Sequence, residues 1–261
     1  MWGRHCPRWS DYDFDANRRD GIAVDWPIRY KDIESWYDYV ETFVGVAGQA
    51  EGLKQAPDGR FIAPFPLNCV ERKMRAAVRE KYPNRVVTPC RTANLSEYNP
   101  EVHLGTRGQC LARNRCKRGC PFGAFFSTQS ATLPVARETG NLTLKSDAIV
   151  MEIVYDERLK KATGVMVKDA NTGEVTTYYA RLIFCNASTV GTAAILLNSR
   201  SETFPNGLGN SSGELGHNLM DHHYGMGASG ILEGYEEEYY KGRRPFYRLN
   251  ALTLKRNRPS I

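Results

Sequence analysis

The chain has 261 residues, of which 41% are hydrophobic and 25% are charged, and its 35 Lys and Arg residues outnumber its 29 Asp and Glu residues. This ordinary composition excludes collagen-like, coiled-coil and wholly disordered proteins. No apolar run approaches the ~18 residues of a membrane-spanning helix, so we expect no transmembrane segment. The net charge of +6 raises the question of a nucleic-acid or membrane partner.

The basic excess lies in one stretch at the end of the sequence. Residues 241–261 contain seven basic residues and no acidic residue, which leaves 28 basic against 29 acidic residues in the rest of the chain. A charge confined to one tail is poor support for a nucleic-acid-binding protein, and we expect no nucleic-acid partner.

Two amphipathic helices are expected in the first half of the chain. Apolar residues at helical spacing from Ile33 to Val44 predict the first, and Gly45 is a stop signal. The second begins at Asn68, where Glu71 three residues later completes a capping box.

The second half begins with a short helix and continues with a meander of strands. Residues 127–138 predict a helix that Pro134 bends or shortens. Alternating and apolar runs predict strands over 142–144, 149–155, 163–167, 175–179 and 181–185. The last strand leads through a small-residue turn into a helix over 189–198, a sequence of elements found in α/β nucleotide-binding folds. A plain strand-to-helix connection without a ligand fits this unit equally well.

Three of the seven cysteines form a close cluster with the spacing C-x5-C-x3-C: Cys110, Cys116 and Cys120. Closely spaced thiolates on irregular backbone, with Pro121 after the last one, are typical of iron–sulfur sites, and three thiolates suit a three-iron cluster. Zinc is the alternative metal, with His103 as a fourth ligand. Buried thiols, or one disulfide with a spare thiol, are the alternatives without metal.

Basic residues surround these cysteines, and no acidic residue lies between 104 and 120. Cations stabilise the negative charge of a thiolate-bound cluster and raise its potential. The basic residues are Arg107, Arg113, Arg115, Lys117 and Arg118. A solvated basic loop and an RNA-binding patch are the alternatives, but an RNA-binding patch would carry aromatic residues here and none is present.

Two later motifs carry weaker signals. Residues 207–213 resemble a dinucleotide fingerprint but place three residues before the third glycine and follow a polar turn, so we reject them as such. Residues 216–223 hold three histidines and an aspartate, for which a polar turn is a better explanation than a metal or acid–base site.

With these motifs in place, the sequence resembles the FAD-dependent glucose–methanol–choline (GMC) oxidoreductases. Within them it is most similar to the flavoprotein subunits of bacterial gluconate, fructose, sorbitol and glucose dehydrogenases. The resemblance runs from Trp2 to about Arg244. The residues that carry it are Trp2–Arg4 with Arg8 and Asp13–Phe14, Asp25–Ile28 with Tyr30, Gly119–Ala124, Ser127, Thr132–Pro134, Gly140–Leu142 and Gly216–His222. In this branch C-x5-C-x3-C holds a [3Fe-4S] cluster, which the resemblance assigns to Cys110, Cys116 and Cys120.

The resemblance also implies a fold and a set of FAD contacts. The expected fold class is α/β, with an incomplete FAD/NAD(P)-binding Rossmann-like domain that contains a β-meander, and part of an α+β substrate domain. The implied contacts are a loop that passes the flavin, a backbone contact to the adenine, a turn beside the ADP moiety and a segment that returns to the cofactor. In that order they are Trp2, Gly3 and Arg4; Val150; Asn186, Ala187 and Ser188; and Asn218, Leu219 and Asp221.

The expected domain organisation follows the same resemblance. Residues 1–140 would form the FAD-contacting loop, helical segments and the cysteine-cluster insertion, and residues 141–223 the β-meander and strand–turn–helix of the FAD-binding domain. Residues 224–244 would begin the substrate-binding domain, and residues 245–261 form a divergent basic tail.

The implied activity is oxidation of a CH–OH group of a sugar or polyol by hydride transfer to FAD. Electrons would pass through the [3Fe-4S] cluster to a cytochrome c subunit or a quinone, with a small accessory subunit as a further partner. The family's catalytic histidine and G-x-G-x-x-G have no match here, so we assign no catalytic residue and expect an internal fragment that is inactive alone. The alternative is a stand-alone iron–sulfur or zinc-binding module for electron transfer or interaction, without flavin chemistry.

Overall fold

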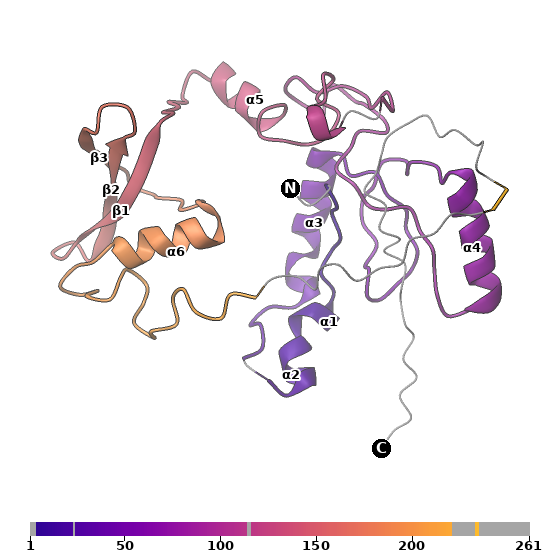
Figure 1. The fold of residues 1–261 in the computed structure, drawn as a ribbon, viewed down its shortest axis with the longest axis horizontal. Coiled ribbons are helices and arrows are strands. Elements are labelled where there is room, and N and C mark those ends of the chain that lie inside the picture. Colours follow the sequence, from indigo (N-terminus) through magenta and orange to yellow (C-terminus); the bar gives the residue numbers. More distant parts are fainter. Residues whose placement is uncertain (1–3, 23, 114–115, 221–232, 235–261) are drawn as a thin grey trace. The chain divides into compact units, whose positions relative to one another are not determined.

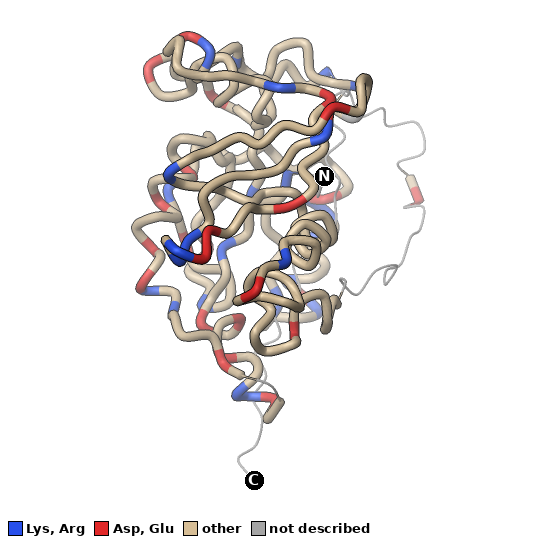
Figure 2. The backbone as a smooth tube through the Cα atoms, turned by 90° about the vertical axis from the view of Figure 1, so that its left-hand side faces the viewer, with Lys and Arg blue, Asp and Glu red and all other residues tan. Residues whose placement is uncertain are grey.

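The computed structural model describes residues 4–22, 24–113, 116–220 and 233–234 (Figure 1). The chain divides into two compact units, one built on Met1–Leu142 and the other on Thr143–Ser229. Basic and acidic residues are scattered along the described chain among many uncharged residues (Figure 2). In these parts of the chain no helix combines the length and the apolar character that crossing a membrane requires.

The first unit is mainly helical and irregular. Its helices are α1 (Asp11–Phe14), α2 (Ala16–Asp20), α3 (Tyr30–Val44), α4 (Cys69–Lys81), the short 3-10 helix η1 (Cys116–Arg118) and α5 (Thr132–Glu138). The two amphipathic helices predicted from the sequence are confirmed as α3 and α4. Gly45 ends α3 in the left-handed conformation, with φ 72°.

The capping box at the start of α4 is also confirmed. Glu71 N–H donates to the Asn68 side chain at 2.8 Å, and Asn68 N–H donates to the Glu71 carboxylate at 2.8 Å. The start predicted for the next helix is wrong by five residues, because α5 begins at Thr132 and residues 127–131 form turns. Pro134 lies in the first turn of α5, where a helix does not need its missing N–H.

The second unit contains a three-stranded antiparallel sheet in the order β1–β2–β3 and one helix. Its elements are β1 (Ala148–Asp156), β2 (Lys161–Asp169), β3 (Val175–Tyr179) and α6 (Ser188–Asn198). The strands and the helix predicted over these residues are confirmed. α6 packs against β1, and there the Ile153 N–H donates to the Ser199 hydroxyl at 2.7 Å.

Two predicted strands are wrong. Residues 142–144 and 181–185 are irregular, because within the described chain neither segment pairs with a neighbouring strand. A strand alone leaves its backbone groups without a ladder, so apolar character is not sufficient to form one. Leu182 and Phe184 remain 75% and 81% exposed.

The core of the first unit is organised around a short backbone stretch, Arg91–Leu95, which we call the central segment. On one side Ala93 N–H donates to the Arg4 carbonyl at 2.9 Å, and Cys6 N–H donates to the Arg91 carbonyl at 3.1 Å. Residues 92–95 are at most 6% exposed. The pairing consists of isolated bridges, so no alternating pattern in the sequence predicted it.

Candidate functional site

The cysteine loop, Cys110–Ala124, is closed at its base by one residue. Cys110 N–H donates to the Leu95 carbonyl at 2.8 Å, and Leu95 N–H donates to the Ala124 carbonyl at 2.9 Å. Leu95 is fully buried. Both ends of the loop are therefore fixed to the central segment, and the loop that carries the predicted ligands starts and ends in the core.

The turn after the last cysteine requires a glycine. Gly123 N–H donates to the Cys120 carbonyl at 3.1 Å, and Gly123 has a left-handed φ of 54°. A Cβ at this position would lie 2.6 Å from the Thr106 carbonyl oxygen. Only glycine avoids both the strain and the clash, so the sequence Cys-Pro-Phe-Gly fits a chain that turns sharply behind the thiol.

The three cysteines offer the right donor chemistry for an iron–sulfur cluster without forming a ready site. All three are half-buried and none is in a disulfide. No three His, Cys, Asp or Glu side chains within the described parts of the chain lie together as a metal-binding group. The thiols therefore fit a cluster by their chemistry, but the described structure does not bring them together.

His103 does not lie with the cysteines. It is 4% exposed, its Nδ1 accepts a hydrogen bond from the Asn99 N–H at 3.1 Å, and its ring stacks with Tyr98. Burial and the nearby Arg107 lower the pKa of His103. The structure therefore assigns His103 to the core and does not bring it to the thiols as a fourth zinc ligand.

The basic shell predicted around the cysteines is not uniform. Arg107 is 5% exposed, its Nη1 donates to the Val44 carbonyl at 2.7 Å at the end of α3, and it lies 5.5 Å over the Phe126 ring. Burial lowers its pKa to about 10. Arg113 lies 5.7 Å over the Phe122 ring within the loop. Arg107 is therefore a core residue, and the alternative of a solvated basic loop is wrong for it.

Three other basic residues lie inside the loop, and the structure describes the side chain of one of them. Arg118 is exposed at the end of η1. Arg115 and the side chain of Lys117 lie outside the described residues.

Arg4 is the described member of the segment that the resemblance assigns to the flavin, since Trp2 and Gly3 lie outside the described residues. Arg4 has a left-handed φ of 66°, and its guanidinium lies 4.9 Å over the Phe125 ring, which follows the cysteine loop. Its Nε is buried without a hydrogen-bond partner among the described groups. A buried donor without an acceptor suits a position where a cofactor supplies one.

Arg4 and the segment that follows the cysteine loop meet on the same residue of the central segment, Ala93. Ala93 donates its N–H to the Arg4 carbonyl on one side and accepts a hydrogen bond from the Phe126 N–H at 2.9 Å on the other.

Cys6, two residues after Arg4, has its pKa raised to about 11 by burial, so it remains a neutral thiol and is a poor metal ligand.

Sequence reasoning missed an ionic lock that holds the N-terminal segment on α3. Arg8 is 3% exposed and donates through Nε to Glu41 Oε1 at 2.9 Å and through Nη2 to Glu41 Oε2 and Asp38 Oδ1, each at 2.5 Å. Its Nη1 donates to the Tyr30 hydroxyl at 2.7 Å. Burial opposes the charge, but the bonds to Glu41 and Asp38 outweigh it and raise the pKa of Arg8. Arg8 belongs to no motif, and the only signal for it in the sequence is its place among the residues that carry the family resemblance.

The second unit contains most of the other predicted FAD contacts. Val150 lies on β1 and is 37% exposed. Asn186, Ala187 and Ser188 are exposed at the start of α6, and Ser188 has a left-handed φ of 65°. The first N–H groups of a helix attract phosphate, so this exposed N-terminus fits the expected contact with the ADP moiety.

The last predicted contacts lie on an exposed loop of the same unit. Asn218 has a left-handed φ of 58°, and its amide donates to the Glu214 carboxylate at 2.7 Å. Leu219 is 67% exposed, and Asp221 lies outside the described residues.

The GMC oxidoreductase family profile matches residues 23–224, which is most of the chain. The chain belongs to the GMC oxidoreductase family. Membership implies an FAD-binding, Rossmann-like α/β fold.

Curated relatives agree with this assignment at low identity. The chain is 28% identical over 249 residues to a 2-methyl-1,2-propanediol dehydrogenase of Mycolicibacterium austroafricanum, covering 91% of the chain and 42% of that protein. It is 24% identical over 227 residues to the fructose dehydrogenase large subunit of Gluconobacter japonicus, covering 85% and 39%. It is 27% identical over 220 residues to the 6'''-hydroxyparomomycin C oxidase of Streptomyces lividus, covering 81% and 38%. The chain spans about two fifths of the length of these relatives.

Proposed function

We propose that the chain is the cofactor-contacting part of an FAD-dependent dehydrogenase that oxidises a CH–OH group of a sugar or polyol. Membership in the GMC family supports the FAD chemistry. The names of two relatives, a fructose dehydrogenase and a diol dehydrogenase, support a polyhydroxylated substrate. Because the chain spans two fifths of those relatives, the proposal concerns the activity of the whole enzyme rather than of these residues alone.

Several groups of the chain would hold FAD. Arg4 would donate its unpartnered Nε to the cofactor, next to Trp2 and Gly3. The exposed start of α6, with Asn186, Ala187 and Ser188, would bind a phosphate through backbone N–H groups. Val150 would supply the backbone contact to the adenine, while Asn218, Leu219 and Asp221 would complete the site.

Cys110, Cys116 and Cys120 would hold a [3Fe-4S] cluster. The observation that supports this part most directly is the closure of the cysteine loop at both ends by Leu95, on the same central segment that binds Arg4. When bound, FAD would accept a hydride from the alcohol carbon, and the cluster would pass single electrons to a cytochrome c subunit or a quinone. Arg113 and Arg118 would stabilise the negative charge of the thiolates. A small accessory subunit is a further proposed partner, and no nucleic acid takes part.

The stand-alone iron–sulfur or zinc module is the weaker proposal. It explains the cysteine spacing but not the family match, which extends over residues 23–224 and far beyond the cysteine loop. The two proposals differ in flavin content, because only the dehydrogenase binds FAD.

The test is the anaerobic reduction of flavin in the purified full-length enzyme by neutral sugars and polyols. We expect bound FAD whose visible absorbance is bleached by at least one member of a panel of fructose, glucose, sorbitol and 1,2-propanediol. Arg4→Met should weaken FAD binding about tenfold, the loss of one good polar contact. The matched control is Arg19→Met, because Arg19 lies on α2, is exposed and pairs with Asp15. Protein without flavin, or flavin that no alcohol reduces, would overturn the proposal.

A further inference from the structure

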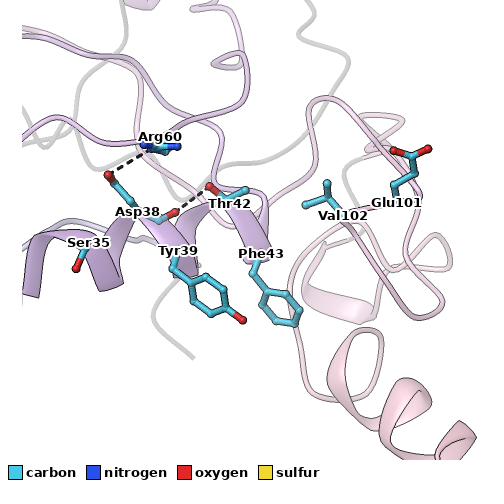
Figure 3. Close-up of a pocket in the computed structure, with 8 residues that line it drawn as sticks. All are labelled: Ser35, Asp38, Tyr39, Thr42, Phe43, Arg60, Glu101 and Val102. Carbon is cyan, nitrogen blue, oxygen red and sulfur yellow. Dashed lines mark hydrogen bonds and ion pairs between the residues drawn. The ribbon is translucent and has the colours of Figure 1, made fainter.

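A pocket of about 570 Å³ lies along one side of α3 (Figure 3). Asp38, Tyr39 and Phe43 are among the residues that α3 supplies, and Arg60 and Val102 from two loops line the pocket as well. This volume is within the range of about 300–1,000 Å³ that is usual for small-molecule sites. None of the described residues that line it is a predicted cofactor contact.

The apolar wall of the pocket is aromatic. Tyr39 and Phe43 are one helical turn apart, and their rings project from the same side of α3 (Figure 3). Tyr39 is 66% exposed, and it also contacts Trp36, which is 67% exposed. The rings of Tyr39 and Trp36 meet edge to face, and the ring of Tyr39 offers a flat apolar surface at the pocket.

The polar wall contains both hydrogen-bond donors and acceptors. Asp38 Oδ2 lies 3.3 Å from Arg60 Nε, and its other oxygen accepts a hydrogen bond from the buried Arg8 at 2.5 Å. The carboxylate is thus fixed in place at the pocket wall. The Arg60 side chain is 75% exposed, and its contact with Asp38 uses one of the five N–H donors of a guanidinium.

The charges in the pocket select the class of ligand. Asp38 and Glu101 repel an anion, and Arg60 repels a cation. A neutral molecule that has hydroxyl groups to donate and accept hydrogen bonds, and an apolar ring face to stack, satisfies both walls. We infer that this pocket binds the ring of a neutral sugar or cyclic polyol, stacked on Tyr39 and hydrogen-bonded to Asp38 and Arg60.

This inference goes beyond the proposed function and does not depend on it, because the ligand class follows from the pocket alone. It is tested by saturation-transfer NMR with methyl β-D-glucopyranoside, which requires neither flavin nor turnover. The cationic glucosamine and anionic glucuronic acid analogues of the same glycoside serve as comparison ligands. We expect transfer to the neutral glycoside and markedly weaker transfer to the two charged ones.

Variants of residues that line the pocket test whether the glycoside binds there. Tyr39→Ala should weaken binding of the neutral glycoside about tenfold, while Tyr39→Phe, which retains the ring, should bind it. Arg60→Gln should also weaken binding. The matched control is Tyr179→Ala, since Tyr179 is a similarly exposed tyrosine (75%) on β3.

Three results would overturn the inference. They are no transfer to the neutral glycoside, equal binding by Tyr39→Ala and the unaltered protein, and binding of a charged analogue in preference to the neutral one. If glycoside binding persists in protein that lacks flavin, only the proposed function fails. If flavin reduction proceeds in the full-length enzyme while Tyr39→Ala binds the glycoside normally, only this inference fails.

Discussion

Two buried guanidinium groups bind α3, and their surroundings are opposite. Arg8 meets the carboxylates of Asp38 and Glu41 in the second half of the helix and the hydroxyl of Tyr30 at its start. Arg107 meets the Val44 carbonyl at the helix end and the Phe126 ring, and its Nε and Nη2 are buried without a partner in the described chain. The pKa of Arg8 is raised by its carboxylate partners, whereas burial lowers that of Arg107 to about 10.

The difference shows two ways of fixing loops on one helix. At Arg8, charge pairing joins the N-terminal segment to α3. At the Arg107 end, close packing joins α3 to the residues that precede the cysteine loop, and the charge contributes little. Removal of Arg8, which would leave buried carboxylates without a partner, should therefore lower the free energy of unfolding more than removal of the unpaired charge of Arg107.

The largest effect is expected for Arg8→Met. It leaves Glu41, which is 4% exposed, as an uncompensated buried carboxylate, so the free energy of unfolding should fall by about 3–5 kcal/mol. Urea unfolding followed by circular dichroism measures this loss. Arg18→Met removes an exposed partner of Asp15 and should cost less than about 1 kcal/mol. Similar losses in the two variants would show that the Arg8 end is not held by buried charge.

The next effect is expected for Gly45→Ala at the Arg107 end. Gly45 has a φ of 72°, and its Cβ would contact Leu95 and lie 2.8 Å from His103 Nε2. Strain and overpacking together should lower the free energy of unfolding by about 2–4 kcal/mol. Gly21→Ala is the control, because Gly21 has a φ of 69° and open space around it, and strain alone should cost about 1 kcal/mol. Equal costs would mean that packing at this end of α3 is loose.

A smaller effect, visible in acid, is expected for Asp38→Asn. The Arg8 guanidinium holds the pKa of the Asp38 carboxyl below its usual value, with further help from Arg60. A lowered folded-state pKa stabilises the protein above the unfolded value of about 4, and this stability is lost as the pH falls below it. Asp38→Asn should therefore show a shallower loss of stability between about pH 4 and pH 2. Thermal unfolding across this range measures it, and an unchanged slope would contradict the Arg8–Asp38 pairing.

The smallest effect is expected for Arg107→Met. A methionine removes the unpaired buried charge together with its hydrogen bond to the Val44 carbonyl. These two changes oppose each other, so the free energy of unfolding should change by less than about 1 kcal/mol in either direction. The same urea experiment measures it beside Arg8→Met. A loss as large as that of Arg8→Met would show that Arg107 has a charge partner, and the contrast between the two arginines would fail.

Elements with a strong local signal could be predicted from the sequence, and the site around the cysteines could not. Gly45 marked the end of α3, and Asn68 with Glu71 marked the start of α4. Alternating and apolar runs predicted the three strands. The central segment, Arg91–Leu95, is held by isolated bridges to distant residues, which leave no period in the sequence.

Arg107 and the apolar residues 181–185 also show that contacts with distant parts of the chain cannot be read from local sequence. In the sequence Arg107 does not differ from the other basic residues near the cysteines. Its burial depends on the Val44 carbonyl and the Phe126 ring, which the fold brings to it from other parts of the chain. Residues 181–185 read as a strand, but a strand requires a partner, and local composition does not supply one.

The measurement that tests the proposed iron–sulfur flavoenzyme most directly is iron and acid-labile sulfide analysis of the purified full-length enzyme and of two cysteine variants. Cys116→Ser changes the cysteine loop, and Cys69→Ser changes a half-buried cysteine on α4 as the control. We predict iron and sulfide in the ratio of a [3Fe-4S] cluster, retained in Cys69→Ser and lost in Cys116→Ser. Absence of iron from the unaltered protein, or unchanged iron in Cys116→Ser, would contradict the assignment of Cys110, Cys116 and Cys120 as cluster ligands.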